Sequence, residues 1–144
     1  MNNEFKIVVK ILSQEEKFKF KQQMVNLGML IDNNSERYIN KYTSCSDFII
    51  YGLFINQNFS GFCVILDNGL NLNLYSFVLE TKYQKKGLGS FFLEEVEKSL
   101  IKVCHASGIG NIAIMLSCKI ELTYFYQKNN YTLLYILKRK NTIS

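Results

Sequence analysis

The sequence predicts a mixed α/β domain in which the strands form one central sheet. Two observations favour this class. Phe48 to Ile55 and Phe59 to Leu66 are rich in β-branched and aromatic residues and flank Asn56-Gln57-Asn58, which is typical of an antiparallel hairpin. The second half of the chain alternates strand-like with helix-like segments, which is typical of β-α-β units. We therefore expect the element order β-α-α-β-β-β-α-β-α-β across one domain, residues 1–144.

The first part of the chain is predicted to form one strand and two helices. Phe5 to Leu12 is rich in β-forming residues and predicts the first strand. Ser13 and Glu16 have the spacing of a capping box, which marks a helix N-terminus. Apolar residues then recur at helical spacing: Phe20, Met24 and Leu27. Gly28 is a plausible end for this helix, and Ser35 to Tyr42 predicts a second, shorter one.

The second half is predicted to alternate strands and helices. Asp67-Asn68-Gly69 is a turn signal that leads into a strand from Leu72 to Leu79. A helix from about Leu88 to Ala106 would follow. Its apolar face would consist of Leu88, Phe91, Phe92, Val96, Leu100 and Val103. The remaining elements would be a strand at Asn111–Ser117, a short helix at Glu121–Lys128 and a last strand at Tyr131–Lys138.

Composition indicates a globular chain without a membrane or metal partner. Hydrophobic residues make up 48% of the chain and aromatic residues 14%, which suits a buried core. No apolar run approaches the ~20 residues that span a bilayer, and the N-terminus lacks the pattern of a signal peptide. The four cysteines form no CxxC pair and His105 is the single histidine, so we expect no metal site. We expect a soluble, cytoplasmic protein.

The charge of the chain is moderately basic. A net charge of +5 permits an anionic partner but does not identify one. The basic C-terminal segment, Leu137 to Ser144, is explained more simply as a solvated end than as an arm that binds nucleic acid. The sequence contains no recognised nucleic-acid-binding motif. We therefore do not expect nucleic acid among the partners.

Two glycines lie one residue apart in the segment YQKKGLGS, residues 83–90, between a predicted strand and a predicted helix. Backbone N–H groups at a helix N-terminus lack internal partners and carry about half a positive charge, so an anion can bind there. The spacing differs from a Walker A loop, and Phe92 occupies the position of the third Rossmann glycine. Gly87 and Gly89 therefore either open the helix or clear space for a phosphate group.

The pattern Q/R-x-x-G-x-G between a strand and an amphipathic helix resembles the acetyl-CoA-binding motif of the GCN5-related N-acetyltransferase (GNAT) family. Here it runs from Gln84 to Gly89. A second segment of that family, N-x-x-A-x-x-[FL]-Y-x-x-x-G-[FY], is similar to residues 119–131. The matching residues are Phe125, Tyr126 and Tyr131, and the departures from Asn, Ala and Gly are Lys119, Leu122 and Asn130. The predicted order of elements is also similar to that of the family.

The resemblance implies an N-acetyltransferase that uses acetyl-CoA as co-substrate and needs no metal. The CoA pyrophosphate would be held by the backbone of Gln84, Lys85, Lys86, Gly87, Leu88, Gly89 and Ser90. The main chain of Phe77, Val78 and Leu79 would pair with the pantetheine amides, and their strand would splay from its neighbour to admit the acceptor. Tyr126 would lie against the cofactor and protonate the leaving thiolate. A phenol with a pKa near ~10 is protonated at pH 7, which suits that role.

The general base is not evident from the resemblance. Family members often carry a carboxylate on the strand before the glycine loop, whereas Leu72 to Leu79 contains none. Tyr75 could relay a proton through water, and Glu80 is the nearest acid in the sequence. These two residues are the candidates for catalytic residues beside Tyr126. A neutral amine delivered from solvent would need little help from a base.

Three interpretations of the function stay open, two of which differ in the acceptor. The segment from Leu79 to Lys82 and its surroundings resembles protein N-terminal and histone-tail acetyltransferases, which favours a protein or peptide amine. Cys118 and the aromatic pattern after it resemble the glucosamine-6-phosphate N-acetyltransferases, although their usual Glu-Asp pair is missing. The third alternative is a non-catalytic acyl-CoA-binding regulator. The resemblance also allows a homodimer, and a nuclear location for a eukaryotic protein acetyltransferase.

Overall fold

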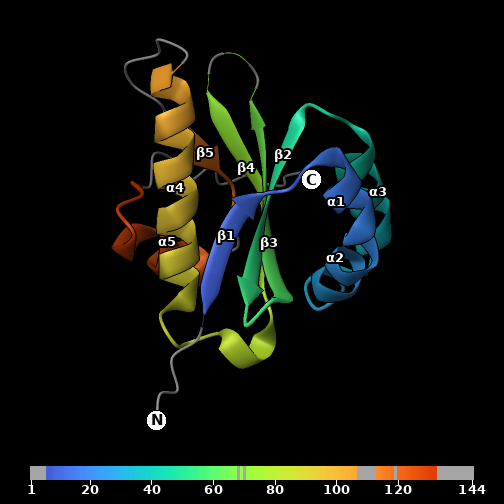
Figure 1. Cartoon of the computed structure of the whole chain (residues 1–144). Helices are drawn as coiled ribbons and strands as arrows, with labels where there is room; N and C mark the ends of the chain where they lie inside the picture. The colour runs from blue at the N-terminus through green and yellow to red at the C-terminus, as the bar shows by residue number, and fades with distance from the viewer. Residues whose placement is uncertain (1–5, 68, 70, 107–112, 119, 133–144) are drawn as a thin grey trace, which may run out of the picture.

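The computed structural model describes residues 6–67, 69, 71–106, 113–118 and 120–132. It contains a five-stranded sheet in the order β1-β2-β3-β4-β5, as Figure 1 shows. The strands are β1 (Ile7–Ile11), β2 (Phe48–Ile55), β3 (Asn58–Asp67), β4 (Leu72–Leu79) and β5 (Ile114–Leu116). Neighbouring strands from β1 to β4 pair antiparallel, whereas β4 and β5 pair parallel. The prediction of a mixed α/β fold around one sheet is confirmed.

Helices cover both faces of this sheet (Figure 1). One face carries α1 (Gln14–Lys19), α2 (Lys21–Gly28) and α3 (Ser35–Ser44). The other carries α4 (Leu88–Ala106) and α5 (Thr123–Lys128). Two 3-10 turns, η1 (Thr81–Tyr83) and η2 (Ile120–Leu122), precede α4 and α5. No helix among the described residues is long and apolar enough to cross a membrane.

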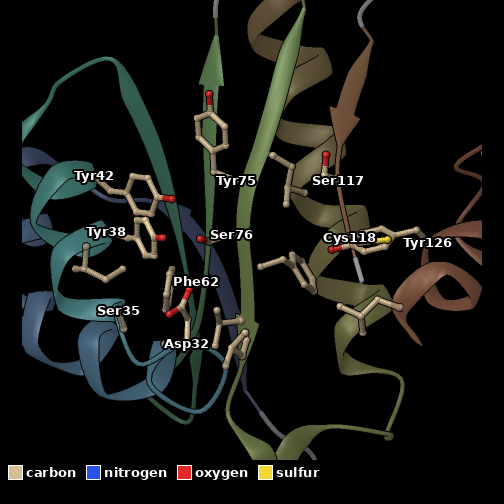
Figure 2. A pocket seen from close by; sticks show the side chains of 17 residues that line it. Asp32, Ser35, Tyr38, Tyr42, Phe62, Tyr75, Ser76, Ser117, Cys118 and Tyr126 are labelled. Carbon is tan, nitrogen blue, oxygen red and sulfur yellow. The ribbon is translucent and has the colours of Figure 1, made fainter. Parts of the chain in front are cut away.

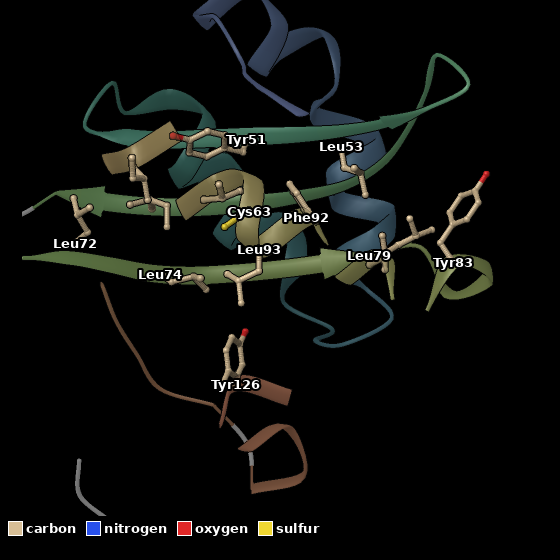
Figure 3. Close-up of a cluster of buried hydrophobic side chains, with 14 of the residues drawn as sticks. Tyr51, Leu53, Cys63, Leu72, Leu74, Leu79, Tyr83, Phe92, Leu93 and Tyr126 are labelled. Atoms are coloured by element: carbon tan, nitrogen blue, oxygen red, sulfur yellow. The ribbon is translucent and has the colours of Figure 1, made fainter. Parts of the chain in front are cut away.

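Each face of the sheet has its own hydrophobic core. Figure 3 shows the core beneath α4, where Phe92, Leu93 and Val96 pack on Leu53 and Cys63 of the sheet. The opposite core lies beneath α1–α3 and contains Met24, Val25, Ile39, Ile50, Phe62 and Val64. Burying side chains of this size contributes about 1.5–3 kcal/mol each to the transfer free energy. β4 contributes side chains to both cores, so burial on both faces of the sheet fixes its position.

The tight turn between β2 and β3 confirms the predicted hairpin. Asn56 and Gln57 have positive φ values of 52° and 73°, as a two-residue type I′ turn requires. The side-chain oxygen of Asn56 accepts a hydrogen bond from the Lys6 N–H at 3.0 Å. Asparagine tolerates this left-handed backbone better than most residues. The turn residues thus explain why the two apolar segments pair with each other.

The prediction of one continuous first helix is wrong, because the structure has two helices, α1 and α2, in its place. The helix is interrupted at Phe20, whose φ and ψ of −98° and 8° lie outside the helical values. Its ring stacks on Phe59 at 5.1 Å between centroids and meets Phe54 edge-on at 5.2 Å. Tertiary packing therefore overrides the helical spacing that the sequence shows here. The end of α2 at Gly28 is confirmed, and α3 runs two residues beyond the predicted Tyr42.

The predicted apolar face of α4 also needs correction. Phe91 is 39% exposed at the edge of the buried stripe, and Val103 is 49% exposed near the C-terminal end of the helix. Leu93, which the prediction omitted, is buried. The buried side chains are Leu88, Phe92, Leu93, Val96 and Leu100. Apart from the adjacent pair Phe92 and Leu93, they are spaced three or four residues apart, as one face of an α-helix requires.

Three predicted elements near the C-terminus have different bounds. β5 covers Ile114–Leu116 of the expected Asn111–Ser117, and residues 111 and 112 lie outside the described residues. The expected helix at Glu121 begins as the 3-10 turn η2 and becomes α-helical at Thr123. Tyr131 and Thr132 are not in a strand, and the rest of the predicted last strand lies outside the described residues.

The capping box at the start of α1 is formed as predicted. The Ser13 hydroxyl accepts from the Glu16 N–H at 3.1 Å, and the Glu16 carboxylate accepts from the Ser13 N–H at 3.0 Å. We expect Ser13→Ala to lower the free energy of unfolding by about 1 kcal/mol, because it leaves a helix N–H without its partner. Chemical denaturation checks this value. An unchanged midpoint at unchanged slope would show that water satisfies the donor equally well.

Candidate functional site

The candidate site forms on β4, at a one-residue bulge. Val64 of β3 pairs with Ser76, and the next residue, Ile65, pairs with Leu74, so Tyr75 is an extra residue in β4. The Tyr75 ring stacks with Tyr42 of α3 at 6.3 Å between centroids. It is 50% exposed, although most of β4 is buried or half-buried. The bulge therefore adds an aromatic side chain on the α3 side of the sheet.

A gap opens beside β4 where its pairing with β5 ends. The last paired residues are Leu74 and Leu116, although β4 continues to Leu79. Beyond this point, Ser117 and Cys118 line a cavity together with Phe77 and Val78 of β4. The cavity has a volume of about 360 Å³. The expectation that β4 separates from its neighbour at Phe77–Leu79 agrees with the point at which the ladder stops.

The cavity brings together side chains from both sides of the sheet. Figure 2 shows Asp32, Tyr38 and Tyr42 on one side and Cys118 and Tyr126 on the other. The complete lining is Gly28, Ile31, Asp32, Ser35, Tyr38, Ile39, Tyr42, Phe62, Leu74, Tyr75, Ser76, Phe77, Val78, Ser117, Cys118, Leu122 and Tyr126. A ligand in this space would be in contact with β4 while reaching the helices on both of its faces.

Tyr126 is a buried titratable side chain on the α4 side of this cavity, where the exposed Cys118 also lies. The exposure of Tyr126 is 8%, and its ring contacts Phe125 and Tyr131 edge-on at 5.0 and 5.6 Å between centroids. Burial, followed by the nearby Cys63 and Cys118, raises the pKa of the Tyr126 phenol well above its usual range. The phenol is therefore protonated at neutral pH and can donate a proton into the cavity.

Asp32 is a cavity residue that the sequence analysis missed. It lies in the connection between α2 and α3, where its Oδ1 accepts a hydrogen bond from the Asn34 N–H at 2.8 Å. Its own N–H donates to the Gly28 carbonyl at 3.0 Å. A signal was available: the polar run Asp32-Asn33-Asn34 interrupts two helical patterns. What the sequence did not show is that this turn folds back to the cavity beside β4.

A close approach between α2 and α3 brings that turn to the cavity. A Cβ atom on Gly28 would overlap the Ser35 Oγ, so a larger residue would displace that hydroxyl from its place. The buried Ser35 hydroxyl in turn donates to the Val25 carbonyl at 2.9 Å. These contacts hold the start of α3 against the end of α2. They position Asp32 and, one to three turns of helix later, Tyr38 and Tyr42.

The glycine loop, residues 83–90, follows β4 in the sequence but does not line the cavity, so it forms a separate part of the site. The Gln84 side chain donates to the Leu79 carbonyl at 2.9 Å and so ties the loop to the end of β4. Lys85 and Gly87 have positive φ values of 62° and 81°. A Cβ on Gly87 would meet no atom within 4 Å, so its backbone conformation rather than crowding favours glycine. Residues 84–87 of the loop are exposed and lie directly before the first residue of α4.

Gly89 has a packing role in addition to the predicted one. A Cβ at this position would lie 3.3 Å from the Phe125 ring, which is tighter than an ordinary contact. The Asn129 side chain also donates to the Ser90 hydroxyl at 3.1 Å. The beginning of α4 therefore contacts α5, the helix that carries Tyr126. This contact joins the two sequence motifs in space.

The two other predicted catalytic residues lie in different surroundings. Tyr75 lines the cavity, as its predicted role requires. Glu80 follows the end of β4, and its carboxylate lies 3.8 Å from the Lys82 ammonium in an exposed ion pair. Glu80 is not among the described residues that line the cavity. The structure thus groups Tyr75, Phe77, Val78 and Tyr126 and leaves Glu80 apart.

The five-stranded mixed sheet of this chain has the fold seen in solved GNAT acetyltransferases. Three solved structures carry this conclusion. Aminoglycoside 6'-acetyltransferase type Ii matches with a TM-score of 0.72 and 19% identity over 93% of this chain and 88% of that one. A GNAT family acetyltransferase of Staphylococcus aureus matches with a TM-score of 0.63 and 18% identity over 94% and 98%.

The third is the glucosamine-6-phosphate N-acetyltransferase of Arabidopsis thaliana. It matches with a TM-score of 0.60 and 17% identity over 94% of this chain and 97% of that one. No protein-family model and no curated protein sequence matches the chain. At these identities the structural likeness shows the fold, which confirms the predicted GNAT-like architecture. It does not extend to the acceptor, on which these enzymes differ by name.

Proposed function

We propose that this chain is an acetyl-CoA-dependent N-acetyltransferase. The observation that carries the proposal is the position of Tyr126, a buried and protonated phenol that lines the cavity where β4 parts from β5. The contact between Gly89 and Phe125 supports it, because it places the glycine loop beside the helix that bears this phenol. The acetyltransferases of the same fold make acyl transfer the chemistry to test first.

The residues present fit acetyl-CoA. The loop from Gln84 to Ser90 offers backbone N–H groups at the N-terminus of a 19-residue helix, where an anion such as a pyrophosphate is favoured. The end of β4, Phe77 to Leu79, lies beyond the last pair with β5, so its main chain can pair with an amide-bearing ligand. When bound, acetyl-CoA would supply the acetyl group as a thioester.

In the proposed reaction the acceptor nitrogen forms an amide bond with the acetyl carbon while the carbon–sulfur bond breaks. Tyr126 would donate its phenolic proton to the departing sulfur, which would leave CoA as the thiol, and the phenolate would then take a proton back from solvent. Tyr75 accepts a hydrogen bond from the amine through water, and the amine's proton passes to solvent along this path. Tyr75 suits this role better than Glu80, because it lines the cavity and Glu80 is paired with Lys82.

The experiment is acetyl-CoA-dependent release of free thiol by the purified chain with a panel of primary amines. Thiol release above hydrolysis, together with an acetylated amine detected by mass spectrometry, would establish the activity. Calorimetry with CoA supplies the second measurement. CoA binding without any turnover would leave a non-catalytic acyl-CoA-binding protein, and failure to bind CoA would overturn the assignment altogether.

A further inference from the structure

The acceptor side of the cavity has a distinct chemistry. We define it as the lining contributed by α3, the connection between α2 and α3, and the β4 bulge, in which Ile31, Asp32, Tyr38 and Tyr75 are exposed and Tyr42 is half-buried. It combines the rings of Tyr38, Tyr42 and Tyr75, the aromatic wall, with the Asp32 carboxylate, as Figure 2 shows. We propose, on the basis of the proposed function, that the acceptor is a primary amine carried on an apolar, preferably aromatic, body without an anionic group.

The aromatic wall favours a flat or apolar body. Tyr42 and Tyr75 are nearly parallel, with an interplanar angle of 9°, and Phe48 supports Tyr75 at 5.7 Å between centroids. Tyr38 and Tyr75 are 44% and 50% exposed, so part of each ring is accessible to a ligand. Tyrosine rings attract both apolar groups and ammonium ions that approach their faces. An arylalkyl ammonium satisfies both preferences.

The rim of the cavity extends this apolar surface. Three consecutive exposed apolar residues follow directly after α2. They are Met29, Leu30 and Ile31, with exposed fractions of 48%, 63% and 55%. Ile31 also lines the cavity. Three consecutive exposed apolar side chains beside an open pocket typically mark a binding surface. They would contact the part of the acceptor that lies furthest from the reacting nitrogen.

The carboxylate selects the charge of the acceptor. Asp32 is the acidic residue among the described lining residues. Among the described residues, no lysine or arginine lies within ion-pair distance of it. The hydrogen bond from the Asn34 N–H sets its orientation. Asp32 is exposed to solvent but lines the cavity, so its carboxylate attracts an ammonium group and repels a carboxylate or a phosphate that enters the cavity. This argues against a sugar phosphate and for an amine whose body bears no negative charge.

The test compares an aromatic amine without an anionic group with amines that carry one. In the presence of CoA, 2-phenylethylamine should bind at least about tenfold more tightly than phenylalanine by calorimetry. In the thiol-release assay its kcat/KM should exceed those of phenylalanine and glucosamine-6-phosphate by a similar factor. Phenylalanyl-glycinamide, an amine of the same chemistry on a peptide, shows whether the source is a free amine or a peptide N-terminus.

Asp32→Asn provides the matched variant, because asparagine can keep the hydrogen bond from the Asn34 N–H. It should weaken 2-phenylethylamine about tenfold and remove most of the discrimination against phenylalanine. Asp67→Asn is the control. Asp67 accepts from the Gly69 N–H at 2.8 Å in a similar turn, outside the described lining of the cavity, and its replacement should change neither value.

Two results would overturn this inference. One is equal or tighter binding of phenylalanine or glucosamine-6-phosphate, and the other is an Asp32→Asn variant with unchanged discrimination. Either can occur in an active acetyltransferase, which leaves the proposed function intact. Thiol release by none of the amines, with the binding preference present, would instead contradict the proposed function alone.

Discussion

Replacement of Tyr126 by phenylalanine is expected to lower kcat by about 10²- to 10³-fold, the range for loss of a general acid. The affinity for CoA should stay unchanged, because the variant keeps the buried ring and its contacts with Phe125 and Tyr131. The physical reason is that the sulfur would leave as an unprotonated thiolate. Single-turnover kinetics and calorimetry measure the two quantities separately.

Tyr124→Phe is the matched control for this variant. Tyr124 lies on the same short helix but is 73% exposed, so loss of its hydroxyl should not change kcat. The pH profile is a further readout. Burial raises the pKa of Tyr126, so the protonated form persists as the pH rises, and this group should cause no loss of kcat below about pH 10. Full activity of Tyr126→Phe would assign the acid role elsewhere.

Gly87→Asp is expected to weaken CoA binding by at least about tenfold relative to Gly87→Asn. The position has a φ of 81° and open space around its Cβ, so both side chains fit, and asparagine and aspartate tolerate this backbone similarly. The variants differ by one negative charge at the N-terminus of α4. That charge would occupy or repel the place of the CoA pyrophosphate.

Thermal stability separates this effect from damage to the fold. An acidic side chain near a helix N-terminus is stabilising, so Gly87→Asp should melt no lower than Gly87→Asn. Gly89 is less suitable for the test, because a side chain there would also press on Phe125. Equal CoA affinities of the two Gly87 variants would show that the pyrophosphate does not lie at this helix terminus.

The features that the sequence predicted correctly depend on neighbouring residues. The capping box at Ser13, the turn at Asn56 and the strand that precedes the glycine loop are all set within a few positions along the chain. Propensity and spacing are sufficient for such features. The resemblance to acetyltransferases rested on two motifs of this local kind, and the comparison of folds supports it.

The features that the sequence did not predict depend on distant contacts. Phe20 ends a helix because rings from the β2–β3 hairpin pack against it. Asp32 reaches the cavity because Gly28 lets α3 approach α2 closely. Neither contact has a signature within the local sequence. For this reason the sequence of β4 and the neighbouring Glu80 does not indicate Asp32, the acid that lines the cavity from another element.

The bulge at Tyr75 has a consequence for insertions and deletions. Within a strand, loss of one residue normally turns every later side chain to the wrong face. In β4 the supernumerary residue is Tyr75 itself, because Leu74 and Ser76 already pair with consecutive residues of β3. A chain that lacked Tyr75 would keep Phe77 towards α4 and Val78 towards α1–α3. Evolution can therefore add or remove this part of the aromatic wall in one step while the later side chains of β4 keep their faces.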